Sequence, residues 1–366
     1  MMAALHGWLH GLLDKLPGNL FGNLPGNLLG NNVDWKQVLL AGATPFFLLA
    51  FVVEWRGARR RGQQASFKWK EIVANVALGT AYQVTEAVAW LLGGGAVFAW
   101  VYQQRLFTIP VNGATVLPIF FMVELCYYCF HRSSHRVRWW WAAHVPHHSG
   151  ETMNFSTAAR QSVLNAAVGA FVFFLPAVWL GVPPAVVMFM LAVNLVYQYF
   201  VHTEAIGKLP AWYEAVFNTP SHHRVHHGRN PRYIDKNYGG VLIIFDRLFG
   251  TWVVEDEAVD YGIPRQIRSY NFLILNFHEM VDLLRDVAAP GPLWQRLRHL
   301  WMPPDWQRPD HVPSHTWTVE RHGDGADQVG AVARSSADSQ TMASPRLPPH
   351  ISADGCKPPQ KAGRSG

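Results

Sequence analysis

The sequence predicts an all-α, polytopic integral membrane protein with about five membrane spans and a cytoplasmic helical cap that is rich in histidine. Three observations predict this fold. Hydrophobic residues make up 49% of the 366 residues and charged residues only 15%, which is apolar for a soluble protein. Charge-free stretches alternate with short basic segments, and ten of the 18 histidines lie between positions 131 and 227.

The two ends of the chain differ from its centre. Residues 1–35 repeat the motif Leu-Pro-Gly-Asn-Leu, whose Pro-Gly and Gly-Asn pairs predict turns and an irregular segment. Residues 36–302 form the predicted membrane-embedded domain. Residues 303–366 are a polar, low-order mixture, which predicts a disordered tail.

The first two predicted spans cover residues 37–53 and 72–100. The first is free of charge, and the second contains a single charged residue, Glu86, together with a predicted break in the helix at Gly93-Gly94-Gly95. Between the spans, residues 54–71 carry six basic and two acidic residues. Basic segments of this kind flank spans on the cytoplasmic side, so the net charge of +6 favours membrane contact and not nucleic acid.

Three further spans are predicted at residues 115–130, 162–181 and 184–201. Residues 161–203 contain no Asp, Glu, Lys or Arg, and Gly181-Val-Pro-Pro184 near their middle predicts a reversing turn. With the amino terminus outside, residues 131–160 and 202–302 lie together as a cytoplasmic cap. Within it, residues 264–302 predict an amphipathic interfacial helix.

The histidines occur at spacings of three and four, which place side chains on one face of a helix. A structural metal site needs about four ligands and a catalytic site about three, so eight to ten imidazoles predict two metal ions. Imidazole binds Zn, Cu, Fe and Ni alike. The predicted ligands are His131, His135, His144, His147, His148, His223, His226 and His227, with His202 and His222 in reserve.

Several carboxylates are candidates for orienting these ligands. Glu124 lies two helical turns before His131, so it could hydrogen-bond a ligand imidazole and fix its tautomer. Glu204 and Asp235 are candidate partners in the cap, with simple solvation or salt bridging as the alternative. Glu86 would be costly inside a membrane, so it predicts either helix pairing or a contact with substrate.

At these residues the chain resembles the fatty acid hydroxylase and sterol desaturase superfamily, whose histidine boxes have the same order. Within it, the sequence looks like the alkylglycerol monooxygenase branch over about residues 70–300. The motifs that carry this resemblance are 144-HVPHHS-149, 154-NFSTAARQS-162, 202-HTE-204, 218-NTPSHHRVHHGRN-230 and 234-IDKNYG-239.

The resemblance implies a membrane-bound di-iron, O2-dependent oxidoreductase that hydroxylates the carbon next to the ether oxygen of an alkylglycerol lipid. Tetrahydrobiopterin is the implied reductant, and the electrons come from outside the chain, from a pteridine or a reductase. The implied catalytic candidates are Glu124, Asn154, Glu204 and Asp235. Arg160, Arg224 and Arg229 could hold a phosphate or the pterin, or could contact lipid headgroups.

Two other functions remain open at this stage. A sterol or fatty-acid desaturase or hydroxylase shares the same boxes and differs in its substrate or product. A membrane metal transporter would also use histidines, but transport would want ionisable groups within the spans, whereas the clustered histidines lie beyond the span ends.

Overall fold

A computed structural model describes residues 35–309 and 311–314, and these residues are helical, with two isolated β-bridges and no β-strand among them. This agrees with the predicted all-α class. The predicted N-terminal segment, apart from Trp35, and the tail from residue 315 onward lie outside the described residues.

The first two predicted spans correspond to three helices. Helix α2 runs from Trp35 to Arg60, and α3 runs from Trp69 to Ala89. A five-residue π-helical turn, η2 (Trp90–Gly94), then leads into α4 (Gly95–Gln103). Gly93 has φ of 153°, a conformation that residues with a side chain rarely adopt, so the predicted irregularity at the three glycines is confirmed.

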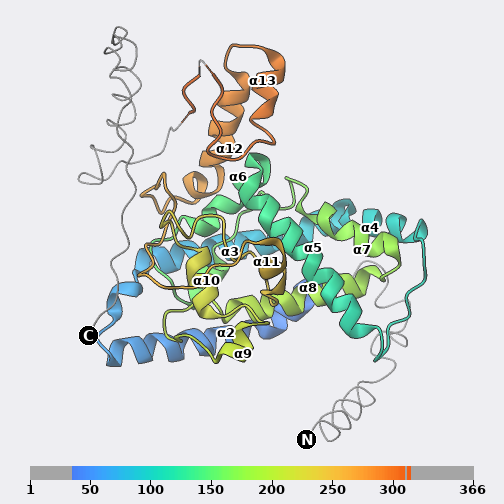
Figure 1. Cartoon of the computed structure of the whole chain (residues 1–366), viewed down its shortest axis with the longest axis horizontal. Coiled ribbons are helices and arrows are strands. Elements are labelled where there is room, and N and C mark those ends of the chain that lie inside the picture. The colour runs from blue at the N-terminus through green and yellow to red at the C-terminus, as the bar shows by residue number, and fades with distance from the viewer. Residues whose placement is uncertain (1–34, 310, 315–366) are drawn as a thin grey trace, which may run out of the picture. The chain divides into compact units, whose positions relative to one another are not determined.

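Helices α5 (Val116–Arg136) and α8 (Pro184–Tyr199) pack against each other, and α2 packs along α8 (Figure 1). Both α5 and α8 end at the histidines. Their opposite ends lie together, where the backbone N–H of Ile109 donates to the carbonyl of Gly181 at 3.3 Å. A core of Val123, Tyr127, Phe174 and Val187 fills the space between these helices.

The fourth predicted span, residues 162–181, is not one continuous helix. Residues 163–169 form turns, and helical structure begins only with η4 (Ala170–Phe174) and α7 (Leu175–Leu180). The indoles of Trp139 and Trp140 both donate to the carbonyl of Val168, at 3.0 and 3.1 Å, and Gly169 has φ of 77°. These contacts satisfy the backbone without a helix, so apolar composition alone mispredicted the element.

The cap consists of short helices and loops around the carboxyl ends of α5 and α8. Helix α12 packs against α6, and the chain after α13 returns to this pair, where His311 contacts Asp286 at 2.9 Å. Described residues of the predicted tail therefore pack against the cap. The cap elements are η1 (Gln64–Ser66), α6 (Arg138–His148), η3 (Phe155–Ala159), α9 (Ala211–Glu214), α10 (Pro220–His226), α11 (Ile244–Phe249), α12 (Phe272–Ala288) and α13 (Leu293–Arg298).

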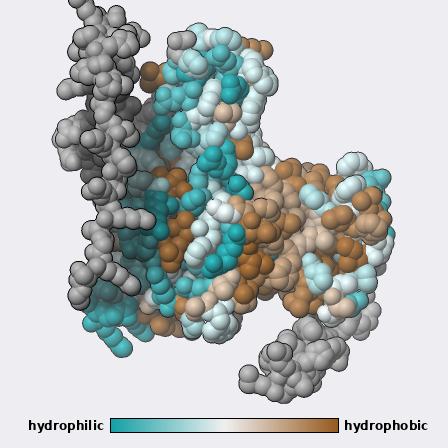
Figure 2. All heavy atoms as spheres, in the orientation of Figure 1, coloured by the Kyte–Doolittle hydropathy of each residue, from teal (hydrophilic) through white to brown (hydrophobic). Residues whose placement is uncertain are grey.

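Two helical stretches, Val38–Arg60 and Gln64–Gln103, are long and apolar enough to cross a membrane, and Ala170–Leu180 and Pro184–Tyr199 are shorter apolar helices. Figure 2 shows hydrophobic residues gathered over α4, α5, α7 and α8, and hydrophilic residues over the cap. Large apolar side chains are also exposed on α2, η2 and α5, among them Phe46, Leu92 and Leu117. An apolar surface of this extent fits a lipid environment.

Candidate di-metal centre

The structure gathers nine histidines into two adjoining clusters, in each of which the candidate ligand atoms lie within 4.8 Å of one another. We call them cluster A and cluster B. Cluster A consists of His131, His135, His144, His148 and His226, and cluster B of His147, His202, His223 and His227. All eight predicted ligands and His202 are included, and His222 is not.

The helices divide the histidines in a regular way. His131 and His135 on α5, and His144 and His148 on α6, are pairs four residues apart, and each pair belongs to cluster A. The pair formed by His223 on α10 and its C-cap residue His227 belongs to cluster B. His147, between His144 and His148, belongs to cluster B, and His226, between His223 and His227, belongs to cluster A. The histidines of one sequence motif are therefore divided between the two clusters, although their spacing places them on one face of a helix.

Backbone carbonyls fix the tautomers of several of these imidazoles. The Nδ1 atom of His131 lies 2.7 Å from the carbonyl of Tyr238, that of His202 lies 2.7 Å from the carbonyl of Gln198, and that of His226 lies 2.9 Å from the carbonyl of Lys236. Because a carbonyl oxygen can only accept, each Nδ1 carries the hydrogen. Each Nε2 then presents a lone pair to its cluster, as metal binding requires.

The spacing of these lone pairs fits a bound cation. Nδ1 of His147 also donates to a carbonyl, that of Arg160, at 3.1 Å, so Nε2 of His147 and Nε2 of His202 both present lone pairs, yet they lie 3.3 Å apart. Nitrogen ligands at about 2.1 Å from one metal lie about 3 Å apart when they are at right angles. In addition, Nε2 of His135 and Nε2 of His226 are buried without a protein partner.

Burial keeps the imidazoles neutral. It lowers the pKa of His202 to about 4, and it lowers the pKa values of His144, His147, His148 and His223 well below the usual value, with neighbouring histidines adding to the effect for these four. Neutral imidazole is the form that binds metals. The clusters are therefore prepared for metal at neutral pH.

One turn, residues 235–238, supplies three contacts to cluster A. Asp235 and Asn237 have φ of 60° and 55°, which Asp and Asn tolerate better than other residues with a side chain. This conformation brings Oδ1 of Asp235 to 3.5 Å from Nδ1 of His135 and directs the carbonyls of Lys236 and Tyr238 to His226 and His131. Asp235 thus lies where a ligand-orienting carboxylate was predicted, whereas sequence reasoning missed the two carbonyls.

Two buried carboxylates hold the chain that follows this turn. Asp246 accepts from the backbone N–H groups of Tyr238 and Gly239, at 2.8 and 2.7 Å. Glu124 accepts from the backbone N–H of Val241 at 2.9 Å and from Asn194 at 2.6 Å. The sequence had suggested that Glu124 bonds a ligand imidazole. Its hydrogen bonds go to Val241 and Asn194 instead, because the chain after Gly239 lies against α5.

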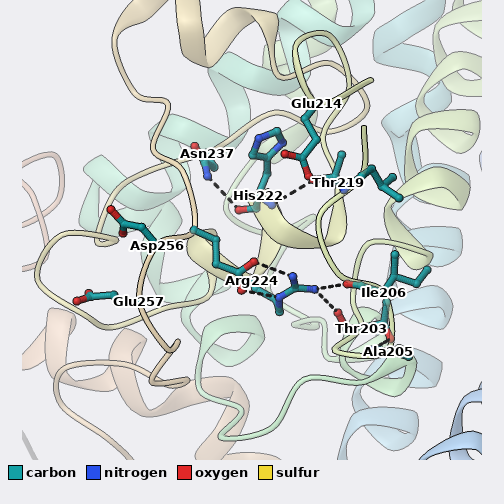
Figure 3. Close-up of polar contacts among 12 residues, drawn as sticks. Thr203, Ala205, Ile206, Glu214, Thr219, His222, Arg224, Asn237, Asp256 and Glu257 are labelled. Atoms are coloured by element: carbon teal, nitrogen blue, oxygen red, sulfur yellow. Dashed lines mark hydrogen bonds and ion pairs between the residues drawn. The ribbon is translucent and has the colours of Figure 1, made fainter. Parts of the chain in front are cut away.

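His222 lies on the other side of α10. Its Nε2 accepts from the indole of Trp252 at 3.2 Å, its carbonyl accepts from Asn237 at 3.1 Å, and Thr219 caps the helix in front of it (Figure 3). Burial lowers the pKa of His222 to about 4. This geometry gives His222 a packing role in the first turn of α10.

Two of the three predicted cofactor-binding arginines are engaged in structural contacts. Arg160 is 2% exposed and donates to Asn75, Ser149 and the carbonyl of Pro146. Arg224 forms a two-point contact with Glu255, at 2.7 Å for each bond, and also donates to two carbonyls of residues 203–206 (Figure 3). Both guanidinium groups hold loops around the clusters.

Arg229 differs, because it lines a cavity of about 300 Å³ that reaches cluster A from the cap. His135, His148 and His226 lie in the wall of this cavity, and Asp260 pairs with Arg229 at 2.8 Å. Charged residues line part of the cavity, namely Asp235, Arg265, Glu279, Asp282 and Asp305, and apolar residues line the rest, among them Trp141, Val145, Ile234, Ile263 and Ile267. The cavity suits a small ligand with both polar and apolar groups that must approach the metal site.

The remaining two predicted site residues lie in supporting positions. Asn154 caps η3 and donates to the carbonyl of Ser66 at 2.7 Å. Glu204 follows cluster residue His202 by two positions but is exposed, and it accepts from Ser66 at 2.6 Å. Both connect η1 to other parts of the cap.

Comparison with known proteins identifies the domain that holds the clusters. Residues 116–251 match the family described as fatty acid hydroxylase, and this range includes all nine cluster histidines. The chain is 41% identical over 211 residues to alkylglycerol monooxygenase from Homo sapiens, covering 57% of this chain and 46% of that protein. It is 34% identical over 272 residues to the Danio rerio protein of the same name, covering 72% of this chain and 59% of that protein.

The chain thus spans about half the length of the curated relatives it matches. No solved structure matches it significantly.

Proposed function

We propose that the chain, whose residues 116–251 match the fatty acid hydroxylase family, is a membrane-bound, O2-dependent lipid monooxygenase with two iron ions. Its proposed reaction is hydroxylation of the carbon next to the ether oxygen of an alkylglycerol lipid. The names of the relatives, alkylglycerol monooxygenase, support this substrate class. The observation that carries the proposal is the pair of histidine clusters with lone pairs directed inward.

The histidines leave the choice of metal open, and the family supports iron. Bound in the two clusters, iron would supply the redox chemistry that activates O2 for attack on an unreactive C–H bond. The residues of the chain prepare the site for this role. Carbonyls of Tyr238, Gln198, Lys236 and Arg160 hold Nδ1–H groups so that Nε2 atoms stay unprotonated, and burial keeps bulk water away from the clusters.

We place the clusters on the cytoplasmic side of a membrane that the chain crosses about five times. Two observations support this arrangement: α2 and α5 both pack against α8, and both α5 and α8 end at the clusters. Six basic residues between 54 and 71, next to the cap, support a cytoplasmic location. In this arrangement a lipid reaches the site from the bilayer, and the cap faces the cytoplasm.

The reductant in this proposal is tetrahydrobiopterin, supplied from the cytoplasm. The cavity of about 300 Å³ beside cluster A supports its entry from the cap, since the charged lining offers hydrogen-bond partners to a polar heterocycle. Arg229 is the one of the three predicted arginines that lines this cavity.

The proposal is tested with the full chain purified in detergent or nanodiscs. We expect about two irons per chain, and consumption of 1-O-hexadecylglycerol that needs O2 and tetrahydrobiopterin but no reductase protein. Hydroxylation next to the ether oxygen gives a hemiacetal, which breaks down to a long-chain aldehyde and glycerol. A single tightly bound zinc with no O2 uptake would refute the proposal, and a product with a new carbon–carbon double bond would identify a desaturase.

A further inference from the structure

A second cavity, of about 320 Å³, lies on the membrane side of the clusters between α3, α4, α5 and α8. Most of its wall is apolar, with Trp90, Phe98, Phe174 and Leu191 among the lining residues. Polar side chains also line it, among them Lys36, Tyr82, Glu86 and Asn165. The cavity therefore has the composition of a binding site for an amphiphile.

The polar side chains are close together. Nζ of Lys36 lies 2.6 Å from Oε2 of Glu86, and Asn165 donates to Oε1 of Glu86 at 3.3 Å. The ammonium of Lys36 is 5.9 Å from the ring centre of Tyr82. Helix pairing explains an ion pair between α2 and α3, but it does not require that the pair border a cavity. A carboxylate offers about four lone-pair directions, so Glu86 can accept further donors.

Two contacts connect the wall of the cavity with cluster histidines. Helix α3 runs away from the cap, and at about 1.5 Å per residue Glu86 precedes Leu92 by about 9 Å along the axis. Asn165 follows Gln161, whose amide nitrogen lies 3.4 Å from Nδ1 of the cluster B residue His147. Tyr127, in the cavity wall, lies beside His131, with ring centres 5.5 Å apart and ring planes tilted by 59°.

The apolar end opens toward the surface at the bend between α3 and α4. Leu92 lines the cavity, yet its side chain is 83% exposed, and Gly93 and Gly94 form the rim beside it. This part of the surface is apolar, since neighbouring Leu91 is also exposed. The cavity thus offers an alkyl chain a direct path from a lipid layer.

We propose that this cavity binds the lipid substrate of the proposed reaction, with its hydroxylated head at Lys36, Glu86 and Asn165 and its alkyl chain directed toward Trp90 and Leu92. The assignment rests on the proposed function for the identity of the lipid. A glyceryl ether bound in this way has its ether oxygen between head and chain, against the wall formed by Tyr127 and Phe130. The ring of Tyr127 in turn lies 5.5 Å from that of His131. The same arrangement excludes a simple alkane, which lacks donors for Glu86.

Photo-crosslinking locates the chain of the lipid independently of catalysis. The probe is a 1-O-alkylglycerol with a diazirine at the chain end, added to the full-length protein in nanodiscs. We expect labelled peptides from residues 90–103 and 184–199, and loss of labelling with excess 1-O-hexadecylglycerol. Labelling confined to cap peptides such as 228–235 or 262–279 would overturn the assignment.

The double variant Lys36→Met/Glu86→Gln tests the polar end, because it removes both charges and retains similar volume. We expect at least a tenfold rise in the KM for 1-O-hexadecylglycerol, since charged hydrogen bonds to the head are lost, with iron content unchanged. The matched control is Lys68→Met/Glu151→Gln, which removes an exposed pair on the cap side of α3. Its KM should equal that of the wild type.

The two proposals fail in different ways. If the wild type oxidises glyceryl ethers while the double variant keeps the wild-type KM and the probe labels the cap, the cavity assignment is wrong and the function stands. If the probe labels residues 90–103 but no glyceryl ether is oxidised, the proposed reaction is wrong and the binding site stands.

Discussion

Nε2 of His147 and Nε2 of His202 lie 3.3 Å apart, and the Nδ1 atom of each donates to a backbone carbonyl. Two lone pairs at this distance repel each other unless a cation lies between them. The backbone carbonyls of residues 160 and 198 therefore prevent a hydrogen bond between these two nitrogens and leave both lone pairs available to a metal. His222 differs from this pair, because its Nε2 lone pair already accepts a hydrogen bond from Trp252.

Replacing His202 and His222 should have different effects on metal content. We expect His202→Ala to lose about one metal per chain, because cluster B would keep three ligands of four. His222→Gln should keep both metals and lose some thermal stability, because a buried side chain at the foot of α10 is altered. Elemental analysis of the purified variants measures this, and equal metal loss in both would contradict the division.

Asp235→Asn should weaken metal binding in cluster A without changing the fold. The side chain keeps its size but loses the charge beside His135, and loss of such a partner typically costs about 10–100-fold in metal affinity or activity. Competition with a chelator measures the affinity. Asp256→Asn is the matched control, because Asp256 pairs with Arg232 on the surface. A wild-type affinity for Asp235→Asn would show that the carboxylate does not orient His135.

The arginines predicted to bind a cofactor should separate into two classes. Arg224→Gln should lower stability by about 3 kcal/mol, because it leaves Glu255 without its two-point partner. Arg229→Gln should instead raise the KM for tetrahydrobiopterin while the KM for lipid stays constant, since Arg229 lines the cavity beside cluster A. Thermal unfolding and steady-state kinetics distinguish the two, and a pterin KM that changes only in Arg224→Gln would reverse the assignment.

Gly240→Ala should damage cluster A from a distance. A Cβ at this position would collide with Asn194 and lie 2.9 Å from Tyr127, displacing the chain that carries the carbonyl of Tyr238. We expect lower stability and a loss of metal. Gly207→Ala is the control, because a Cβ there meets nothing within 4 Å. Metal content and unfolding temperature would be measured, and similar values for both variants would contradict the packing argument.

Asp246 should make stability depend on pH. Burial raises its pKa to about 6, although Thr251 and the backbone N–H groups of Tyr238 and Gly239 stabilise the charged form. The folded state therefore binds a proton more tightly than the unfolded state, whose Asp has a pKa of about 4. This contribution to stability is complete below pH 4 and is lost as pH rises to about 6.

The test compares metal-free wild type with Asp246→Asn between pH 4 and 7. The difference in unfolding free energy between the two should change by a few kcal/mol over this range and be constant above it. A difference that is independent of pH would show that Asp246 is already charged at pH 4.

Spacing in the sequence located every histidine that the structure brings together, but it could not divide them between two clusters. The division depends on how α5, α6 and α10 meet, and it sends His147 and His226 away from their immediate neighbours. The carbonyls of Tyr238 and Gln198 were also beyond prediction, because any residue has a carbonyl and only the fold decides where it points. The motif Asp-Lys-Asn at 235–237 was the one sequence signal for this turn, because Asp and Asn tolerate the positive φ that it requires.

Charge and hydropathy predicted the helical class and the break at Gly93, but not the form of residues 162–181. Apolar composition there fits a span, whereas Trp139 and Trp140 from the cap bind the backbone at Val168 and replace the helix with turns. Glu124 was assigned to the wrong partner for a similar reason. Its carboxylate meets the backbone of Val241, more than 100 residues later in the sequence.

One peptide bond separates His147 from His148 and another separates His226 from His227, and each bond joins a ligand of one cluster to a ligand of the other. Adjacent Cα atoms are about 3.8 Å apart, so the backbone itself keeps the two clusters close together. An inserted or deleted residue at either junction would therefore disturb both clusters at once.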